Sequence, residues 1–148
     1  MTIAIVLIAV VAILIISIFR IKKGDTEVLA IQKSLVEEYC NFIKNRNYEE
    51  AYEMYNSRFK KEISFEKFAT QLQKKQLENG LLLNKEYAKH HKSYNLFSRI
   101  TEYQIFYHLT FEKNKIYGAI IINNQDKTLK IEGTYIDSAN DTLSYYLW

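Results

Sequence analysis

Two glutamates and a tyrosine in a predicted strand region are the residues best suited to acid–base chemistry. They are Glu102, Tyr103 and Glu132. An isomerase-like reaction needs such a group in an apolar pocket, where burial shifts its pKa. None of the three lies in a recognisable motif, and acids are rarely buried without a partner. We therefore expect the charged residues, Glu102 and Glu132, on the solvent face of strands, and we predict no catalytic residue, no cofactor and no enzymatic activity.

Three histidines raise the question of a metal site. His90 and His91 are adjacent, and His108 stands alone. Adjacent residues on a strand point to opposite faces, so the pair cannot easily share one ion, and no cluster of Cys or carboxylates completes a tetrahedral set. We expect no metal site and interpret His90-His91 as a loop pair beside a basic segment.

Cys40 is the only cysteine of the chain. It follows Tyr39 near an apolar stripe, and neither a nearby histidine nor a catalytic-cysteine pattern surrounds it, so we expect a packed thiol. A single thiol excludes an internal disulfide and leaves the cellular compartment open.

Apolar spacing of three and four predicts the helices that position these residues. One stripe, from Val28 to Ile43, indicates a helix of about five turns. Asn47, with Glu50 three positions later, has the spacing of a capping box for a second helix. Ser64 is expected to cap a third helix, which Gly80 would end.

Beyond Gly80 the apolar period falls to two, which indicates strands. Residues 81–87 form a short predicted strand, residues 104–111 alternate in polarity, and turns at 112–115 and 123–126 lead into further strands. The fold class is therefore α+β: three helices packed on a curved, cone-like antiparallel sheet of about four strands, preceded by a transmembrane helix.

The N-terminal segment is predicted to cross a membrane. Residues 2–19 carry no charge, and at 1.5 Å per residue such a helix reaches roughly 27 Å, enough to span a bilayer. No basic region precedes the apolar run and no cleavage site follows it, which argues against a signal peptide. We assign residues 1–23 to a single-pass anchor with a basic flank and residues 24–148 to one α+β globular domain.

The flanking residues Arg20, Lys22 and Lys23 bear on topology. Lys and Arg favour the cytoplasmic side, so the rule places the domain in the cytoplasm, at the cell (inner) membrane. The very short N-terminus offers little charge to compare with this basic flank, so the extracytoplasmic orientation stays open.

Charge distribution bears on the partners. Without the three flanking cations the domain has 17 basic and 17 acidic residues, which argues against a nucleic-acid binder. Residues 58–99, however, carry 10 basic and 4 acidic side chains. This excess is either a solvated face or a surface facing a membrane or a partner, and its lysines are Lys60, Lys61, Lys67, Lys74, Lys75, Lys85, Lys89 and Lys92.

Three phrases of the helical region carry a family resemblance. They are "NYEEAY" at 47–52, "SRFKK" at 57–61 and "SFEKF" at 64–68. Together they resemble the helical opening of the nuclear transport factor 2-like (cystatin-like) superfamily over roughly residues 26 to 138. The resemblance implies a cone-shaped domain; some members are isomerases, and others are membrane-anchored assembly factors.

Two functions remain open at this point. The first is a non-enzymatic, membrane-anchored interaction domain, either an accessory or assembly subunit of an envelope complex or an immunity-type binding protein. Its partner would be a protein, and a homo-oligomer is compatible with it. The alternative is a membrane-tethered cone that binds or isomerises a small ligand. A cone filled by Tyr and Phe favours the first, and an open apolar cavity favours the second.

The C-terminal tail is unusually apolar. Tyr145, Tyr146, Leu147 and Trp148 end the chain, whereas chain ends are generally polar. The tail either packs on the domain as an edge strand or cover, or serves as an anchor for a partner or the membrane interface.

Overall fold

The computed structural model describes Val11, residues 26–137 and residues 143–145. The chain divides into two compact units, residues 1–37 and 38–148. No helix within the described ranges is long and apolar enough to cross a membrane. The predicted span, residues 2–19, lies outside those ranges except for Val11, so the anchor stays a prediction.

In the first unit, a helix over residues 26–31 continues into the π-helical turn η1, Gln32–Val36. Ile31 and Val36 are both buried, although a spacing of five does not fit an ordinary α-helix. The wider π turn accommodates the extra residue and keeps both side chains on the buried side. The sequence predicted a regular helix here.

Four helical segments follow the π turn. The sequence predicted three at this point: the end of the first helix and two further helices. The four segments are α2 (Glu37–Lys44), α3 (Tyr48–Glu53), α4 (Ser57–Glu62) and α5 (Phe65–Asn79). The second predicted helix is thus split into α3 and α4. The side chain of Asn56 caps α4, because its Oδ1 accepts a hydrogen bond from the Phe59 N–H at 2.9 Å.

The other two predicted caps differ from each other. Ser64 caps α5, as predicted, by accepting a hydrogen bond from the Lys67 N–H at 3.4 Å. Asn47 precedes α3, but its side chain makes no cap bond. The capping-box prediction was therefore correct for the start of the helix and wrong for the side-chain hydrogen bond of Asn47.

The split between α3 and α4 has a tertiary cause. The Asn56 N–H donates to the Ile131 carbonyl at 2.8 Å, and the Ile131 N–H donates to the Met54 carbonyl at 3.0 Å. Tyr55 thereby forms an isolated parallel bridge with Ile131. A continuous helix would use these backbone groups internally, so pairing with the sheet ends α3.

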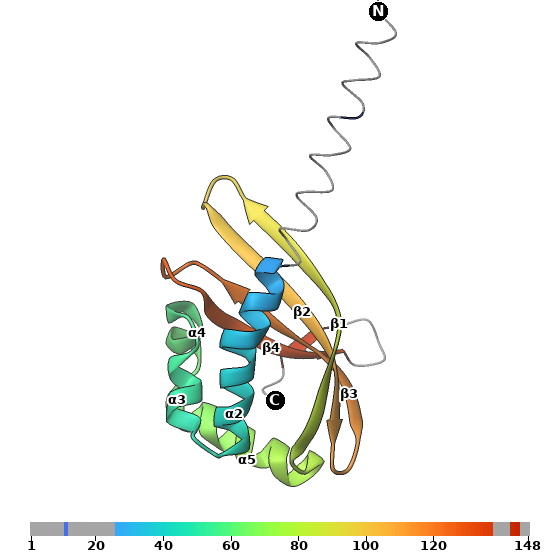
Figure 1. Cartoon of the computed structure of the whole chain (residues 1–148). Coiled ribbons are helices and arrows are strands. Elements are labelled where there is room, and N and C mark those ends of the chain that lie inside the picture. The colour runs from blue at the N-terminus through green and yellow to red at the C-terminus, as the bar shows by residue number, and fades with distance from the viewer. Residues whose placement is uncertain (1–10, 12–25, 138–142, 146–148) are drawn as a thin grey trace, which may run out of the picture. The chain divides into compact units, whose positions relative to one another are not determined.

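Five strands form one antiparallel sheet in sequence order, with helices α3 to α5 on one side of it (Figure 1). This confirms the predicted α+β class with helices on an antiparallel sheet. The sheet has one strand more than the approximately four that the sequence predicted. The strands are β1 (Leu82–Asn95), β2 (Ile100–Phe111), β3 (Lys115–Asn123), β4 (Lys130–Asp137) and β5 (Leu143–Tyr145).

The alternating strand predicted near residue 105 is β2. Its buried side chains are at every second position, Tyr103, Ile105, Tyr107, Leu109 and Phe111. These side chains form the sheet side of the core, because alternate residues share one face.

Strand β1 is longer than predicted. It continues to Asn95, and His90 and His91 pair with Ile105 and Gln104 of β2. The loop assignment for these histidines was therefore wrong. None of the fourteen residues of β1 is buried, so they show no apolar alternation, and main-chain pairing with β2 forms the strand.

Gly80 ends α5 with φ 76° and ψ −167°, a conformation that is essentially restricted to glycine. A Cβ there would lie 2.6 Å from the Cβ of Glu112. We expect Gly80→Ala to lower the free energy of unfolding by about 1–3 kcal/mol, measured by denaturant titration of the full chain in detergent. Leu77→Ala, at a side chain that is 78% exposed on the same helix, is the control; equal stability of the two variants would contradict the prediction.

Asp126 holds the start of α4. Its carboxylate accepts hydrogen bonds from the Ser57 hydroxyl and N–H, each at 2.7 Å, and these bonds keep the pKa of Asp126 below its ordinary value. A lowered pKa means that the stabilisation is complete above the ordinary value of about 3.9 and is lost as the pH falls through the lowered pKa.

Asp126→Asn should therefore lower the melting temperature at pH 7, and the gap from the unmodified chain should narrow below about pH 4. Thermal unfolding followed by circular dichroism over a pH series measures this. Glu49→Gln, at an exposed carboxylate of α3, should show no such gap. A gap for Asp126→Asn that is constant with pH would contradict the assignment.

Candidate functional site

The space between the helices and the sheet of the second unit is filled by aromatic rings. Tyr55 stacks on Phe59 with ring centroids 4.0 Å apart. The rings of Phe68 and Tyr39 meet Tyr55 edge-on at 5.3 and 5.8 Å. All four side chains are at most 1% exposed. This is the arrangement expected for a core in which aromatic side chains take the place of a ligand.

Hydroxyl groups inside this core bond to one another. The hydroxyls of Tyr39 and Tyr55 lie 2.9 Å apart, and that of Tyr55 lies 3.5 Å from Thr134 Oγ1. Burial, and next the nearby Tyr55, raises the pKa of Tyr39 well above its ordinary value. A phenol with a raised pKa stays protonated near neutral pH, so this group is not suited to act as a general base.

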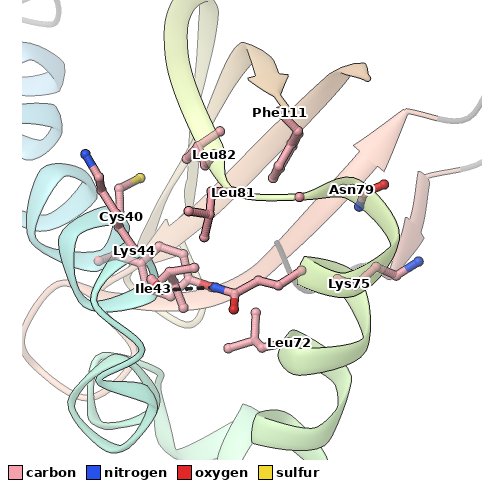
Figure 2. A pocket seen from close by; sticks show the side chains of 12 residues that line it. Cys40, Ile43, Lys44, Leu72, Lys75, Asn79, Leu81, Leu82 and Phe111 are labelled. Carbon is pink, nitrogen blue, oxygen red and sulfur yellow. Dashed lines mark hydrogen bonds between the residues drawn. The ribbon is translucent and has the colours of Figure 1, made fainter. Parts of the chain in front are cut away.

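A partly open hollow beside this core is small, with a volume of about 20 Å³. Tyr39 lines it, together with Cys40, Leu72 and Phe111 (Figure 2). This volume is room for about one water, whereas ligand pockets generally measure about 300–1,000 Å³. Cys40 is buried, as expected for a packed thiol.

A second hollow, of about 500 Å³, lies at the end of α5. It is an open groove with side chains of mixed character, including Arg46, Gln73, Leu77 and Glu112. Neither it nor the small cavity contains any of the proposed acid–base residues.

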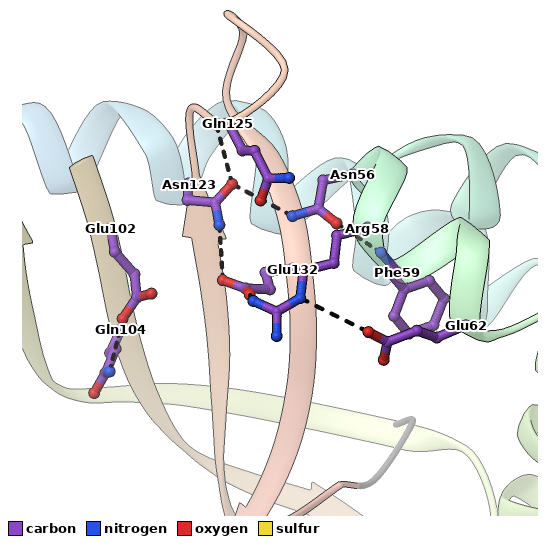
Figure 3. A network of polar contacts seen from close by, with 9 residues as sticks. All are labelled: Asn56, Arg58, Phe59, Glu62, Glu102, Gln104, Asn123, Gln125 and Glu132. Carbon is purple, nitrogen blue, oxygen red and sulfur yellow. Dashed lines mark hydrogen bonds and ion pairs between the residues drawn. The ribbon is translucent and has the colours of Figure 1, made fainter. Parts of the chain in front are cut away.

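Glu132 belongs to a polar network instead (Figure 3). Its carboxylate accepts a hydrogen bond from Asn123 Nδ2 at 2.7 Å and forms an ion pair with Arg58 at 3.2 Å. Asn123 in turn accepts from Asn56 Nδ2 at 3.4 Å. These contacts join the start of α4 to β3 and β4, which is a structural role.

The other two acid–base candidates are also engaged. Glu102 accepts a hydrogen bond from Gln104 Nε2 at 2.9 Å on the same strand. Tyr103 is buried on the core face of the sheet, and Lys92 Nζ lies 5.1 Å from the centre of its ring. The three candidates are therefore not brought together around a common space.

The histidines are spread over the sheet. His90 Nδ1 lies 2.7 Å from the Tyr87 hydroxyl, and the His108 ring lies 5.0 Å from that of Tyr117. Within the described part of the chain, no group of three or more His, Cys, Asp or Glu side chains could hold a metal ion.

The eight lysines of the basic segment do not form one surface. Five lie on α4 and α5, where Lys60 pairs with Glu53 at 2.6 Å and Lys75 with Glu78 at 3.0 Å. The other three lie on β1. Lys92 is opposite the core-facing Tyr103, whereas Lys89 is opposite Phe106, whose neighbours place it on the other face.

The structure reveals a feature that the sequence patterns did not: large apolar side chains are exposed along β1 and its turn. Leu83 is 63% exposed and Leu96 is 78% exposed, Phe97 is fully exposed, and Tyr87 and Tyr94 are about half exposed. The available signal was "YNLFSR" at 94–99, in which two apolar residues stand alone between polar ones. It was missed because no periodicity marks them.

The remaining predicted site residues are only partly described. Tyr145 ends β5, which pairs with β4 at the edge of the sheet. Tyr146, Leu147 and Trp148 lie outside the described residues, and so do the flanking Arg20, Lys22 and Lys23.

A structural role for Glu132 has a measurable consequence. Glu132→Ala should destabilise the chain by about 1–3 kcal/mol, because Asn123 and Arg58 lose an acceptor in a part-buried setting. Glu102→Ala removes a carboxylate that is bonded only to a residue of its own strand among the contacts described above, so it should lower the free energy of unfolding by less. Chemical unfolding of both variants tests this, and the opposite order would overturn the assignment.

The comparisons with known proteins add no identity to this geometry: no family model, no curated protein and no solved structure matches the chain.

Proposed function

We propose that the chain is a membrane-anchored, non-catalytic interaction domain of the nuclear transport factor 2-like type. It would act as an accessory or assembly subunit of an envelope complex, or as an immunity-type binding protein. The observation that carries this proposal is the concentration of exposed large apolar side chains on β1, beside a core that is filled by tyrosine and phenylalanine.

The filled core supports binding by the outer surface rather than by a ligand pocket. A cone that binds or isomerises a small molecule needs an open apolar cavity with converging polar groups. The hollow beside Tyr39 has room for about one water, and the acid–base candidates Glu102 and Glu132 are bonded elsewhere.

Strand β1 offers a binding face for a protein. In the described sheet it has a strand neighbour on one side only, so its outer edge presents backbone groups to which an extended segment can add. Register shifts between Leu82 and Asn84 and between Tyr87 and Lys89 interrupt that edge. The partner would place apolar pockets over Leu83 and Tyr87 and an acidic group near Lys85.

The membrane anchor is the second part of the proposal and rests on the sequence. Residues 2–19 are uncharged, and Arg20, Lys22 and Lys23 follow them. This pattern favours a single-pass helix in the cell (inner) membrane with the domain in the cytoplasm.

Pull-down from detergent-solubilised membranes, followed by mass spectrometry, tests the binding face. Leu83→Asp should remove a partner that the unmodified chain retains, because the charge would enter an apolar contact. Leu129→Asp is the matched control, since Leu129 is also an exposed leucine but precedes β4. Loss of the same partner with both variants, or with neither, would rule out β1 as the binding face.

Carbonate washing tests the anchor independently. The full-length chain should stay in the membrane pellet, because a spanning helix is not released by breaking ionic contacts. A C-terminal phosphatase fusion, active only outside the cytoplasm, should be inactive. Release by carbonate would refute the anchor, and an active fusion would reverse the orientation.

A further inference from the structure

The turn between β1 and β2 is held in a defined conformation. It comprises residues 96–99 between the paired Asn95 and Ile100. Asn95 Oδ1 accepts hydrogen bonds from the Phe97 N–H at 3.0 Å and the Ser98 N–H at 3.1 Å. Arg99 adopts φ 56° and completes the turn. The side chains at the apex are therefore presented by an ordered backbone.

The apex presents apolar side chains to solvent. Leu96 is 78% exposed, Phe97 is fully exposed, and Tyr94 is 54% exposed. A single exposed apolar residue is ordinary, but a compact group of three at the end of a hairpin indicates a contact site. Packing in the core does not explain why these residues are apolar, because a fully exposed phenylalanine buries no apolar surface.

Cationic side chains predominate at this end of the hairpin. Residues 89–101 contain Lys89, Lys92 and Arg99 together with His90 and His91, and Glu102, which pairs with Ser93, adds one acidic side chain. Lys89 and Lys92 lie over the rings of Phe106 and Tyr103, which holds both lysines on the hairpin. This end of the hairpin thus combines a small apolar wedge, an aromatic side chain at its base and an excess of positive over negative charge.

These features favour a lipid surface over a protein pocket. Aromatic residues concentrate at the membrane interface, and lysines and arginines beside them are attracted to anionic headgroups. From this we propose that the β1–β2 turn inserts Leu96 and Phe97 into the interfacial layer of an anionic bilayer. The proposal rests on the anchor of the proposed function for its proximity to lipid.

Insertion would leave the opposite end of the hairpin free for the proposed partner. Leu83 and Asn95, the last residue before the turn, are twelve residues apart along β1, which corresponds to roughly 40 Å of extended strand. The lipid contact and the partner contact therefore use different parts of β1.

A fluorescent probe at the apex tests the insertion. The full chain carries Cys40→Ala and Ser98→Cys, is labelled with a polarity-sensitive dye and is reconstituted in vesicles of phosphatidylcholine with phosphatidylserine. Ser98 is chosen because Leu96 and Phe97 then stay in place. The emission should shift to the blue, and spin-labelled lipids should quench it. The same dye at Leu77→Cys, an exposed site on α5, should behave as in water.

Two variants define the cause of the signal. Leu96→Ser combined with Phe97→Ser should abolish the blue shift and the quenching at position 98. Replacing Lys89, Lys92 and Arg99 by Gln should lower the ratio of inserted to free turn by about a hundredfold in anionic vesicles, at about fivefold per charge, with little change in neutral ones.

The outcomes separate the insertion from the anchor. A dye at position 98 that stays water-like in anionic vesicles, or becomes apolar only when a membrane protein is added, overturns the insertion. A signal that survives the double serine variant also overturns it. Release of the chain by carbonate, with a lipid-quenched signal before release, refutes the anchor and supports the insertion.

Discussion

Two main-chain hydrogen bonds between the segment Met54–Asn56 and Ile131 fasten the helices of the second unit to its sheet. They end α3, and they leave Asn56 in place to cap α4. They also direct Tyr55 inward, where its ring stacks on Phe59 and meets Phe68. The position of α4, the aromatic core and the polar network around Glu132 all follow from this one attachment, because each includes a residue of the attached segment or its direct neighbour.

The same attachment explains why the proposed function lies on the surface. With Tyr55 and Tyr39 bonded through their hydroxyls, the described hollow beside Tyr39 is too small for a metabolite. Strand β1 is the contrasting element, since none of its residues is buried and its outer edge has no strand neighbour within the described sheet. A strand that contributes so little to the core is free to carry side chains chosen for contact with other molecules.

Sequence patterns gave the parts of the fold in which local chemistry and burial agree. The alternation from Ile105 to Phe111, the Ser64 cap and the Gly80 stop were predicted correctly, because each follows from spacing or from a special residue. Patterns failed where distant pairing decides the structure, as at Met54–Asn56. They also failed for β1 beyond Tyr87, because a strand exposed on both faces has no period to detect. The exposed pair Leu96 and Phe97 was missed for the same reason, and the candidate acids were placed near strands without their actual partners.

The bridge between Tyr55 and Ile131 joins residues 76 positions apart in the sequence, and this separation constrains how the chain is made. During synthesis the helical segment leaves the ribosome well before β4, and domains generally fold as units. Until Ile131 has emerged, Tyr55, Phe59 and Phe68 lack the strand that fixes their positions. The nascent chain must therefore carry an exposed aromatic cluster while the 63 residues from Ala69 to Ile131 are added, which makes it a candidate for chaperone binding during translation.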